Sequence, residues 1–489
     1  MSQPINHLVI VGRDAPLWLA ASTLARALAP SSLTVTAVEL PSKATSADLH
    51  ASLPALEALH KQLRLDERRL LSAVGGAYTL GWNFADAGGA VAPFLHPFGA
   101  FGSPIAGQDF FPHWLRARRH GLSVPLEDFS LTAAAARQGR LFIPDTESER
   151  YGRSDYGYHL PALAYAGVLK DVARQAGVTI LSAASLSPVR DGETGLINAL
   201  ALEDGRRVEG DFFLDVTGPD ALLIGGPGNG MTSWAFPADR VLTARGPRLT
   251  SIPTYAEVRG FADGWLALRP AQAGTFITAV WKSGPGEGDV LRRLPSLCGF
   301  APQDAIVRSS SPGLRARAWD GNCVALGSAA VRLDPLHDLD LLSVQQGLVH
   351  LLAHFPRTMR LNAAQAEYNR VTAGHFTHLR DFQALHYHLA RHPGAFWDAA
   401  RALPLSDDLF HRVALFRARG ELAPWEEDDL APDSWRAFLA GHGLLPDSHP
   451  PGVDLLPPDD LKAHLRHMLG FVKNQVLRQP VHDAYLRGG

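Results

Sequence analysis

The first forty residues carry two hydrophobic patterns in turn. Residues 8–11 (LVIV) form a short, fully apolar and β-branched run, which predicts a buried strand. Residues 18–28 (WLAASTLARAL) then place apolar side chains at helical spacing, and residues 33–40 (LTVTAVEL) return to a strand pattern. A strand, a helix and a second strand in this order predict the β-α-β unit that opens a nucleotide-binding fold.

The middle of the chain contains the same kinds of element. Residues 159–177 predict a helix that ends at its glycine, and residues 178–183 (VTILSA) predict a strand. Residues 196–218 predict a hairpin around Asp204-Gly205 that leads into another buried strand. Residues 323–330 (CVALGSAA) return to a strand followed by a turn and a helix.

The remaining segments differ in character. A helix is expected over 53–63, a strand over 75–84 and a Gly/Pro/Phe-rich loop over 96–104. β-type segments between 229 and 320 predict a second sheet, and the chain from about 339 onward is mostly helical in pattern.

Together these patterns predict an α/β (α+β) fold in three parts. The parts are a discontinuous Rossmann-type nucleotide-binding domain (1–110, 155–228 and 320–355), a β-rich domain on the substrate side (111–154 and 229–319), and a helical C-terminal region (356–489).

Composition narrows the class of protein. With 489 residues, 46% of them hydrophobic and 19% charged, the chain is long enough for several domains with cores of their own. A net charge of -3 without long blocks of one sign gives no reason to expect nucleic acid or a membrane surface as partner. Cys298 and Cys323 are the only cysteines, which excludes a disulfide framework, and no secretory or membrane-spanning pattern is present. We therefore expect a cytoplasmic protein that binds small molecules or proteins.

Several stretches, in the right order over nearly the whole chain, resemble the flavin-dependent tryptophan halogenase family. They are DFFLDVTGPDALLIG (211–225), the segment 321–356, HPFG (96–99), LRDFQALHYHLARH (379–392) and DSWRAFLAGHGLLP (433–446). The resemblance implies an FAD-dependent monooxygenase-like fold with a Rossmann-type core, a β-sheet substrate domain and a helical C-terminal region. Function is a separate question, because it depends on the site.

The resemblance also implies a chemistry. In that family FAD is reduced by a separate flavin reductase, binds, and reacts with oxygen and halide to give hypohalous acid. A lysine with a nearby glutamate then delivers electrophilic halogen to an indole or another small aromatic molecule. A homodimer would also be in keeping with the family.

The dinucleotide turn keeps one of the three glycines that the resemblance implies. Gly12 holds the first position, while Asp14 and Leu17 hold the second and third. A carboxylate about 4 Å from a phosphate costs about 4 kcal/mol per charge pair at an effective dielectric of about 20. FAD binding therefore requires a displaced loop or an Asp14 that points away. Glu39, at the end of the second strand, keeps the place of the acidic residue that binds the adenosine ribose; the alternative is an exposed glutamate at a strand end.

Four further cofactor-binding positions follow from the resemblance. Ala47 and Leu49 replace the two glycines of the loop that covers the flavin, and a backbone that needs positive φ at either place would be strained. Gly218 lies in the 211–225 match, and Gly327 lies in the 321–356 match that carries the flavin-contacting loop.

The two catalytic positions are both substituted. Thr79 stands where the family has its lysine, and it has no amine. His337 stands where the family has its glutamate; it could act as a general base oriented by Asp338, or be a loop histidine without a catalytic role. Leu339 and Asp340 replace the small pair that holds chloride. Lys61 on a preceding helix is expected to be a solvated residue.

The substrate side is partly altered. DGWLALRP keeps Trp265 of the family's Trp-x-Trp-x-Ile-Pro motif, and His96 and Phe98 lie in the matching HPFG segment. Trp265 could equally be a core residue. His375 and His378 share a helix face, but no carboxylate or cysteine completes a set of ligands, so we expect an amphipathic helix with these histidines facing solvent, and no metal.

Three functions remain open at this stage. The first is a flavoprotein of the family whose halogenation machinery has been altered, with another oxygenation as one outcome. It is not a competent halogenase, because Thr79 and His337 replace lysine and glutamate. The second is a non-catalytic descendant that binds a small molecule or a protein and no longer binds FAD. The third, an active halogenase with a relocated lysine, has the least support.

Overall fold

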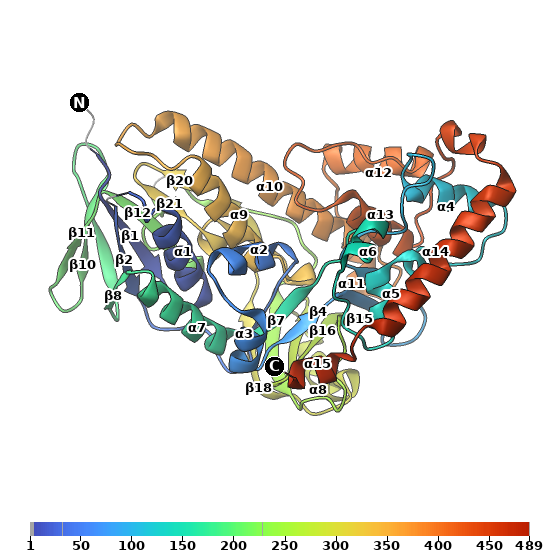
Figure 1. Cartoon of the computed structure of the whole chain (residues 1–489). Coiled ribbons are helices and arrows are strands. Elements are labelled where there is room, and N and C mark those ends of the chain that lie inside the picture. Colours follow the sequence, from blue (N-terminus) through green and yellow to red (C-terminus); the bar gives the residue numbers. More distant parts are fainter. Residues whose placement is uncertain (1–3, 32, 227, 489) are drawn as a thin grey trace. The chain divides into compact units, whose positions relative to one another are not determined.

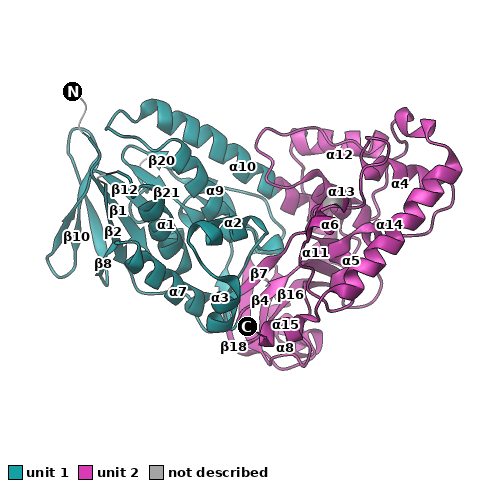
Figure 2. Ribbon diagram, in the orientation of Figure 1, with its two compact units in different colours: residues 1–75, 160–239, 306–380 teal, residues 76–159, 240–305, 381–489 magenta. Residues whose placement is uncertain are grey.

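The computed structural model describes residues 4–31, 33–226 and 228–488. The chain divides into two compact units, which are described separately (Figure 2). Unit 1 comprises residues 1–75, 160–239 and 306–380, and unit 2 comprises residues 76–159, 240–305 and 381–489. The three-part domain division expected from the sequence stays a prediction.

Unit 1 is built on a six-stranded sheet in the order β20-β21-β12-β1-β2-β8 (Figure 1). All of its strands except the short edge strand β20 run parallel. The strands are β1 (His7–Gly12), β2 (Thr34–Glu39), β8 (Thr179–Ser182), β12 (Phe212–Val216), β20 (Trp319–Asp320) and β21 (Cys323–Ala325).

The central strand β1 is apolar because the sheet is covered by helices. Its residues from Leu8 to Val11 are completely buried, and α1 (Asp14–Ala27) packs against β1, α7 (Ala162–Gln175) and α9 (Asp340–Ala353). The β-α-β unit expected from the first forty residues is confirmed as β1, α1 and β2.

Smaller elements complete unit 1. The hairpin expected around Asp204-Gly205 is confirmed: β10 pairs antiparallel with β11, and β9 extends this sheet. The elements are β3 (Leu49–Ala51), β9 (Leu186–Arg190), β10 (Ile197–Leu202), β11 (Arg207–Glu209), β13 (Met231–Ser233), β19 (Gly313–Arg315), β22 (Val331–Arg332), α2 (Ala55–Gln62) and α3 (Glu67–Val74).

Unit 2 contains the second sheet that the β-type segments predicted, in which β14, β17, β16, β15, β5 and β6 are successive neighbours. They are β5 (Gly81–Asp86), β6 (Phe94–Pro97), β14 (Arg240–Gly246), β15 (Ala256–Phe261), β16 (Gly264–Ala271) and β17 (Gly274–Trp281). Helix α8 (Glu287–Cys298) covers one face, where Val290 and Leu294 join the buried cluster of Leu266 and Trp281. The prediction of a loop at 96–104 is wrong at its start, because His96 belongs to β6 and pairs there with Trp82 on β5.

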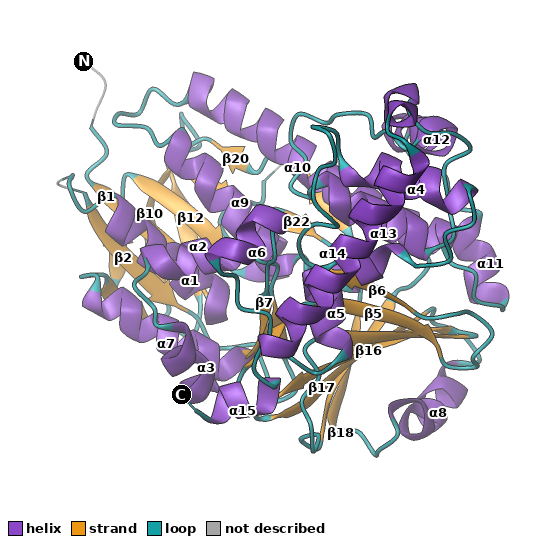
Figure 3. Ribbon diagram, turned by 45° about the vertical axis from the view of Figure 1, so that its right-hand side comes forward, coloured by secondary structure: helices purple, strands orange, loops and turns teal. Residues whose placement is uncertain are grey.

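The C-terminal part of unit 2 is helical, as expected, and the strands and helices are distinguished by colour in Figure 3. The other elements of unit 2 are β4 (Ala77–Thr79), α4 (Phe110–Arg119), α5 (Leu131–Arg137), α6 (Thr146–Tyr151), α11 (Ala395–Arg401), α12 (Asp407–Arg419), α13 (Pro432–Gly441), α14 (Pro458–Arg478) and α15 (His482–Arg487). β7 (Gly157–Pro161), β18 (Gln303–Ser309) and α10 (Asn362–Leu389) cross the division between the units.

The histidines of α10 correct one expectation. His375 is buried, and its Nε2 lies 2.8 Å from His350 Nε2, because this part of α10 packs through Phe376 and Leu379. A solvent-facing helix was therefore the wrong interpretation of this segment. No group of three His, Cys, Asp or Glu side chains within the described ranges is arranged to hold a metal ion. None of the helices in these ranges is both long enough and apolar enough to cross a membrane.

Candidate functional site

The turn after β1 has a backbone conformation that is typical of glycine, although only Gly12 of its three expected glycines is present. A Cβ on Gly12 would lie 2.6 Å from the carbonyl oxygen of Val216 on the neighbouring strand, so the strands require glycine there. Asp14 has a φ of 59°, the left-handed conformation that glycine adopts freely and aspartate tolerates. Leu17 lies on the first turn of α1, and its side chain is fully buried. Pro16 has no backbone N–H, so it removes one of the donors that a helix N-terminus offers to an anion.

The carboxylate of Asp14 is bonded to the loop that follows β2. It accepts hydrogen bonds from Ser42 Oγ and from the backbone N–H of Lys43, the latter at 3.2 Å. These bonds fix the direction of the Asp14 side chain. The two donors also offset part of the carboxylate's negative charge, which reduces its repulsion of a phosphate.

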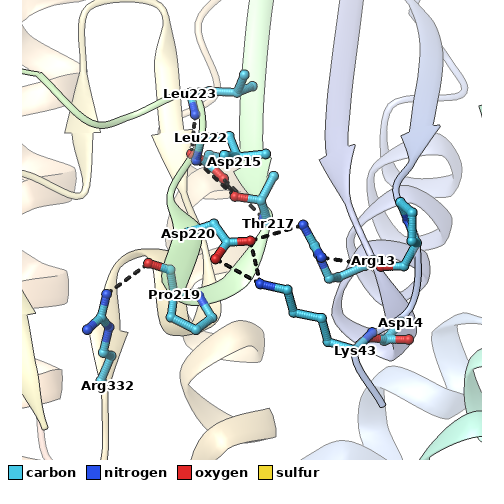
Figure 4. Close-up of polar contacts among 11 residues, drawn as sticks. Arg13, Asp14, Lys43, Asp215, Thr217, Pro219, Asp220, Leu222, Leu223 and Arg332 are labelled. Carbon is cyan, nitrogen blue, oxygen red and sulfur yellow. Dashed lines mark hydrogen bonds and ion pairs between the residues drawn. The ribbon is translucent and has the colours of Figure 1, made fainter. Parts of the chain in front are cut away.

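Asp220, in the turn after β12, forms ion pairs with two nearby cationic side chains. Lys43 Nζ lies 2.6 Å from Asp220 Oδ2, and Arg13 donates to the same oxygen at 3.2 Å (Figure 4). Arg332 donates to the carbonyl oxygen of Pro219 at 2.8 Å. Arg13, Lys43 and Asp220 were not predicted from the sequence. Their positions in the turns and loops that follow adjacent parallel strands were the signal that could have identified them.

Glu39 lies in an open pocket of about 470 Å³ at the ends of β2 and β8. Its carboxylate forms an ion pair with Lys170 at 2.6 Å and lies within 3.4 Å of Ser182 Oγ. The pocket is lined by Glu39, Leu40, Pro41, Ser42, Ser182, Ala183, Ala184 and Glu203. A carboxylate can accept further hydrogen bonds beside Lys170, so this pocket has the donor-acceptor chemistry that a ribose needs.

The loop before β3 is not strained. Neither Ala47 nor Leu49 is among the residues with positive φ; Ala47 is buried and Leu49 begins β3. Between them, Asp48 accepts from the backbone N–H of Thr45 at 2.8 Å and from Arg308 at 3.0 Å. This segment has therefore acquired a conformation that needs no glycine, and the strain expected there is absent.

His50, also on β3, was missed by the sequence analysis. Burial lowers the pKa of His50 below its usual value, and the nearby carboxylates of Asp14 and Asp48 oppose that shift only in part. A neutral imidazole therefore lies beside the dinucleotide turn at neutral pH.

A fully buried carboxylate holds the turn that contains Gly218. Asp215 accepts from the N–H and hydroxyl of Thr217 at 3.0 and 2.7 Å, and from the N–H groups of Leu223 and Ile224 at 2.7 and 2.9 Å. This turn includes a left-handed position, and Gly218 occupies it with a φ of 76°.

Gly327 and His337 lie in loops of unit 1 with left-handed residues. Gly327 has a φ of 57°, and a Cβ there would lie 3.0 Å from Val344 Cγ2. His337 (φ 67°) and Asp338 (φ 57°) are consecutive left-handed residues that are not glycine, a conformation that costs roughly 1–3 kcal/mol per residue. The His337 side chain is buried.

Thr79 is a buried strand residue of unit 2. It pairs with Gly157 across β4 and β7, is 3% exposed, and donates its hydroxyl to the carbonyl oxygen of Gly81 at 3.2 Å. Lys61, in unit 1, is exposed and forms an ion pair with Glu57 one turn earlier on α2, which raises the pKa of Lys61. The solvated role expected for Lys61 agrees with this geometry.

The three expected substrate residues belong to the aromatic core of unit 2. The rings of His96 and Phe98 lie 5.3 and 4.9 Å from that of Trp82, measured between ring centroids. Burial lowers the pKa of His96 to about 3, so the imidazole is neutral. Trp265 is 1% exposed and donates its Nε1–H to the hydroxyl of Tyr387 at 2.8 Å.

The predicted positions thus fall into separate groups. Gly12, Asp14, Glu39 and Gly218 lie at the ends of β1, β2 and β12, on one edge of the unit 1 sheet. Thr79, His96, Phe98 and Trp265 belong to unit 2, whereas His337 belongs to unit 1. The sheet edge at which the sequence predicts cofactor binding therefore lies entirely within unit 1.

Replacing Gly12 by alanine tests the close approach of β1 and β12. We expect Gly12→Ala to lower the free energy of unfolding by about 1–3 kcal/mol, because the new Cβ overlaps the Val216 backbone. Gly167→Ala in α7 is the matched control: its Cβ meets open space, and alanine favours a helix by about 0.5–1 kcal/mol. Urea denaturation of both variants measures the difference. Equal stabilities would contradict the packing argument.

Comparisons with known proteins cover almost the whole chain. Residues 7–458 match the tryptophan halogenase family. The structure of BrvH, a flavin-dependent halogenase from Brevundimonas sp. BAL3, is similar with a TM-score of 0.93 and 30% identity, over 99% of this chain and 100% of that chain. A flavin-dependent halogenase from Xanthomonas campestris also has a TM-score of 0.93, with 31% identity over 99% and 98% of the two chains. The tryptophan 6-halogenase SttH of Streptomyces toxytricini is 25% identical over 91% of this chain and 88% of its own length.

Proposed function

The chain belongs to the tryptophan halogenase family, and on that premise we propose that it is a flavoprotein homologue that does not transfer halogen. The membership confirms the resemblance and the fold expected from the sequence. The family implies the use of FAD and of a separate flavin reductase, and we propose both for this chain.

The observation that carries the proposal is Thr79. A hydroxyl can neither form a chloramine nor donate from an ammonium to hypohalous acid, and this hydroxyl is buried and bonded to Gly81. Lys61 offers no replacement, because its ammonium is engaged by Glu57 on the exposed face of α2. His337 replaces the carboxylate that would work beside the lysine.

The residues at the sheet edge fit FAD in part. Glu39 would accept from the ribose, and Arg13 and Lys43 would meet the pyrophosphate, but Asp220 already engages both cations. FAD, when bound and reduced, would supply oxygen activation. This chain's own contribution is to position the dinucleotide at the end of β1 and to keep His50 neutral beside it.

A binding measurement distinguishes the proposed flavoprotein from the second candidate, a non-catalytic descendant that does not bind FAD. That candidate is favoured by one observation, the engagement of Arg13 and Lys43 by Asp220. We expect the purified protein to lack flavin colour and to bind FAD on titration, measured by the change in flavin fluorescence. Absence of binding at millimolar FAD would favour the descendant. Bromide-dependent formation of halogenated indole would contradict the proposed function itself.

A further inference from the structure

Three neighbouring strands bring charged side chains to one place. β12, β1 and β2 are parallel, so the residues that follow them meet at the same edge of the sheet. Asp220 follows β12, Arg13 follows β1, and Lys43 lies in the loop after β2; Figure 4 shows their side chains directed toward one another. Open α/β sheets bind ligands at this edge.

The contacts show two cations sharing one carboxylate. Lys43 Nζ lies 2.8 and 2.6 Å from the two oxygens of Asp220, and Arg13 lies 3.2 Å from Oδ2. The second terminal nitrogen of Arg13 donates to the carbonyl oxygen of Pro41 at 3.2 Å. The buried Nε of Arg13 has no hydrogen-bond partner in the described part of the chain. Lys43 and Asp220 are 54% and 34% exposed, so this cluster can be reached from solvent.

The carboxylate of Asp220 is presented by a defined turn. Gly218 and Ala221 flank it with φ values of 76° and 46°, and the N–H of Ala221 donates to the carbonyl oxygen of Gly218 at 3.1 Å. Arg332 bonds the carbonyl oxygen of Pro219 from the other side. Asp220 therefore occupies a fixed position, while the long side chains of Arg13 and Lys43 can change partner.

We propose that Asp220 is a built-in anion that competes with the phosphates of an incoming nucleotide for Arg13 and Lys43. The inference rests on the proposed function, since it concerns the phosphate end of the same dinucleotide site. A diphosphate offers more charge and more acceptor oxygens than one carboxylate, and its hydrogen bonds to cations are strong. Partly exposed ion pairs contribute little, so a diphosphate displaces Asp220 at a moderate cost in affinity.

Asp14 has no part in this exchange. Its carboxylate is bonded to Ser42 Oγ and to the backbone N–H of Lys43, and these bonds hold the loop that carries the Lys43 side chain. The aspartate in the second glycine position therefore supports the cluster, whereas Asp220 opposes the ligand.

The experiment compares three probes on four proteins. FAD and ADP carry a diphosphate and riboflavin carries none, so the set distinguishes a dinucleotide, a smaller nucleotide and the flavin ring. Dissociation constants are measured by isothermal titration for the wild-type chain, Asp220→Asn, Lys43→Gln and the control Asp171→Asn. Asp171 is an exposed carboxylate of α7 paired with Arg174, so the control makes the same charge change elsewhere in unit 1.

We expect Asp220→Asn to bind FAD and ADP about tenfold more tightly than the wild type, a difference of about 1.4 kcal/mol. Its affinity for riboflavin should equal that of the wild type. Lys43→Gln is expected to weaken both diphosphates, and the control to change neither. Circular dichroism checks that each variant is folded, and Lys43→Gln tests the cluster independently if Asp220→Asn does not fold.

Unchanged or weaker diphosphate binding by folded Asp220→Asn would overturn the inference, as would the failure of FAD and ADP to bind any of the four proteins. Tighter FAD binding without tighter ADP binding would also contradict it, because both probes carry the diphosphate. Two outcomes distinguish the proposals. Halogenation by the wild type would refute the proposed function and leave this order of affinities unaffected, whereas an unchanged FAD affinity of folded Asp220→Asn would refute this inference alone.

Discussion

Replacing Asp215 by alanine is expected to lower the free energy of unfolding by about 3–5 kcal/mol, because the substitution leaves buried donors without their acceptor. Asp215 is completely buried and accepts four hydrogen bonds, two from Thr217 and one each from Leu223 and Ile224. Burial lowers the pKa of Arg315, and the nearby charge of Asp215 opposes that shift in part. The carboxylate therefore stabilises the whole turn after β12, including the segment that presents Asp220.

Asp215→Asn tests the same network with almost no change in volume. Its amide group would direct two hydrogens at N–H donors that need an acceptor, so this variant should lose much of the same free energy. Urea denaturation followed by tryptophan fluorescence measures the loss, since Trp319 lies on the edge of the same sheet. The exposed Asp171→Asn should change stability by less than about 0.5 kcal/mol. A loss below about 1 kcal/mol in both Asp215 variants would contradict the proposed role of the network.

The second large effect concerns activity. We expect no halogenated product from this protein, because Thr79 offers no amine and its buried hydroxyl is bonded to Gly81. Thr79→Lys should not restore activity by itself. It would place an ammonium in a site that is 3% exposed, where desolvation disfavours the charge, and the partner position would still be His337. A soluble Thr79→Lys protein that gives halogenated indole would contradict this reasoning.

The core of the fold could be predicted because burial leaves a pattern in the sequence. The apolar run at residues 8–11 and the helical spacing at 18–28 became β1 and α1, since a parallel strand is covered on both faces. β6 could not be predicted, because it is a strand only through pairing of His96 with Trp82 on β5. The buried histidines of α10 were missed for a similar reason: His350, which bonds His375, lies 25 residues earlier.

The site could be predicted only at the level of positions. Gly12 and Glu39 were identifiable because they end β1 and β2. The partners of the neighbouring residues Asp14 and Arg13 could not be predicted from the sequence. Asp14 bonds a serine 28 residues away, and Arg13 pairs with an aspartate 207 residues away. The left-handed backbone at Asp14 and His337 leaves no signal in residue type either. The aspartate at position 14 suggested a phosphate site weakened by charge repulsion. In the structure Asp14 is bonded to the loop after β2, and Asp220 is the carboxylate that engages the cations.

The predicted absence of halogen transfer can be tested directly. The purified protein is supplied with FAD, a flavin reductase, NADH, oxygen, bromide and either indole or tryptophan, and the products are analysed by mass spectrometry. A tryptophan halogenase such as SttH, in a parallel reaction, shows that the assay works. We predict that no brominated product exceeds the level of the reaction without enzyme. Bromide-dependent product above that level, and absent from heat-denatured protein, would contradict the account.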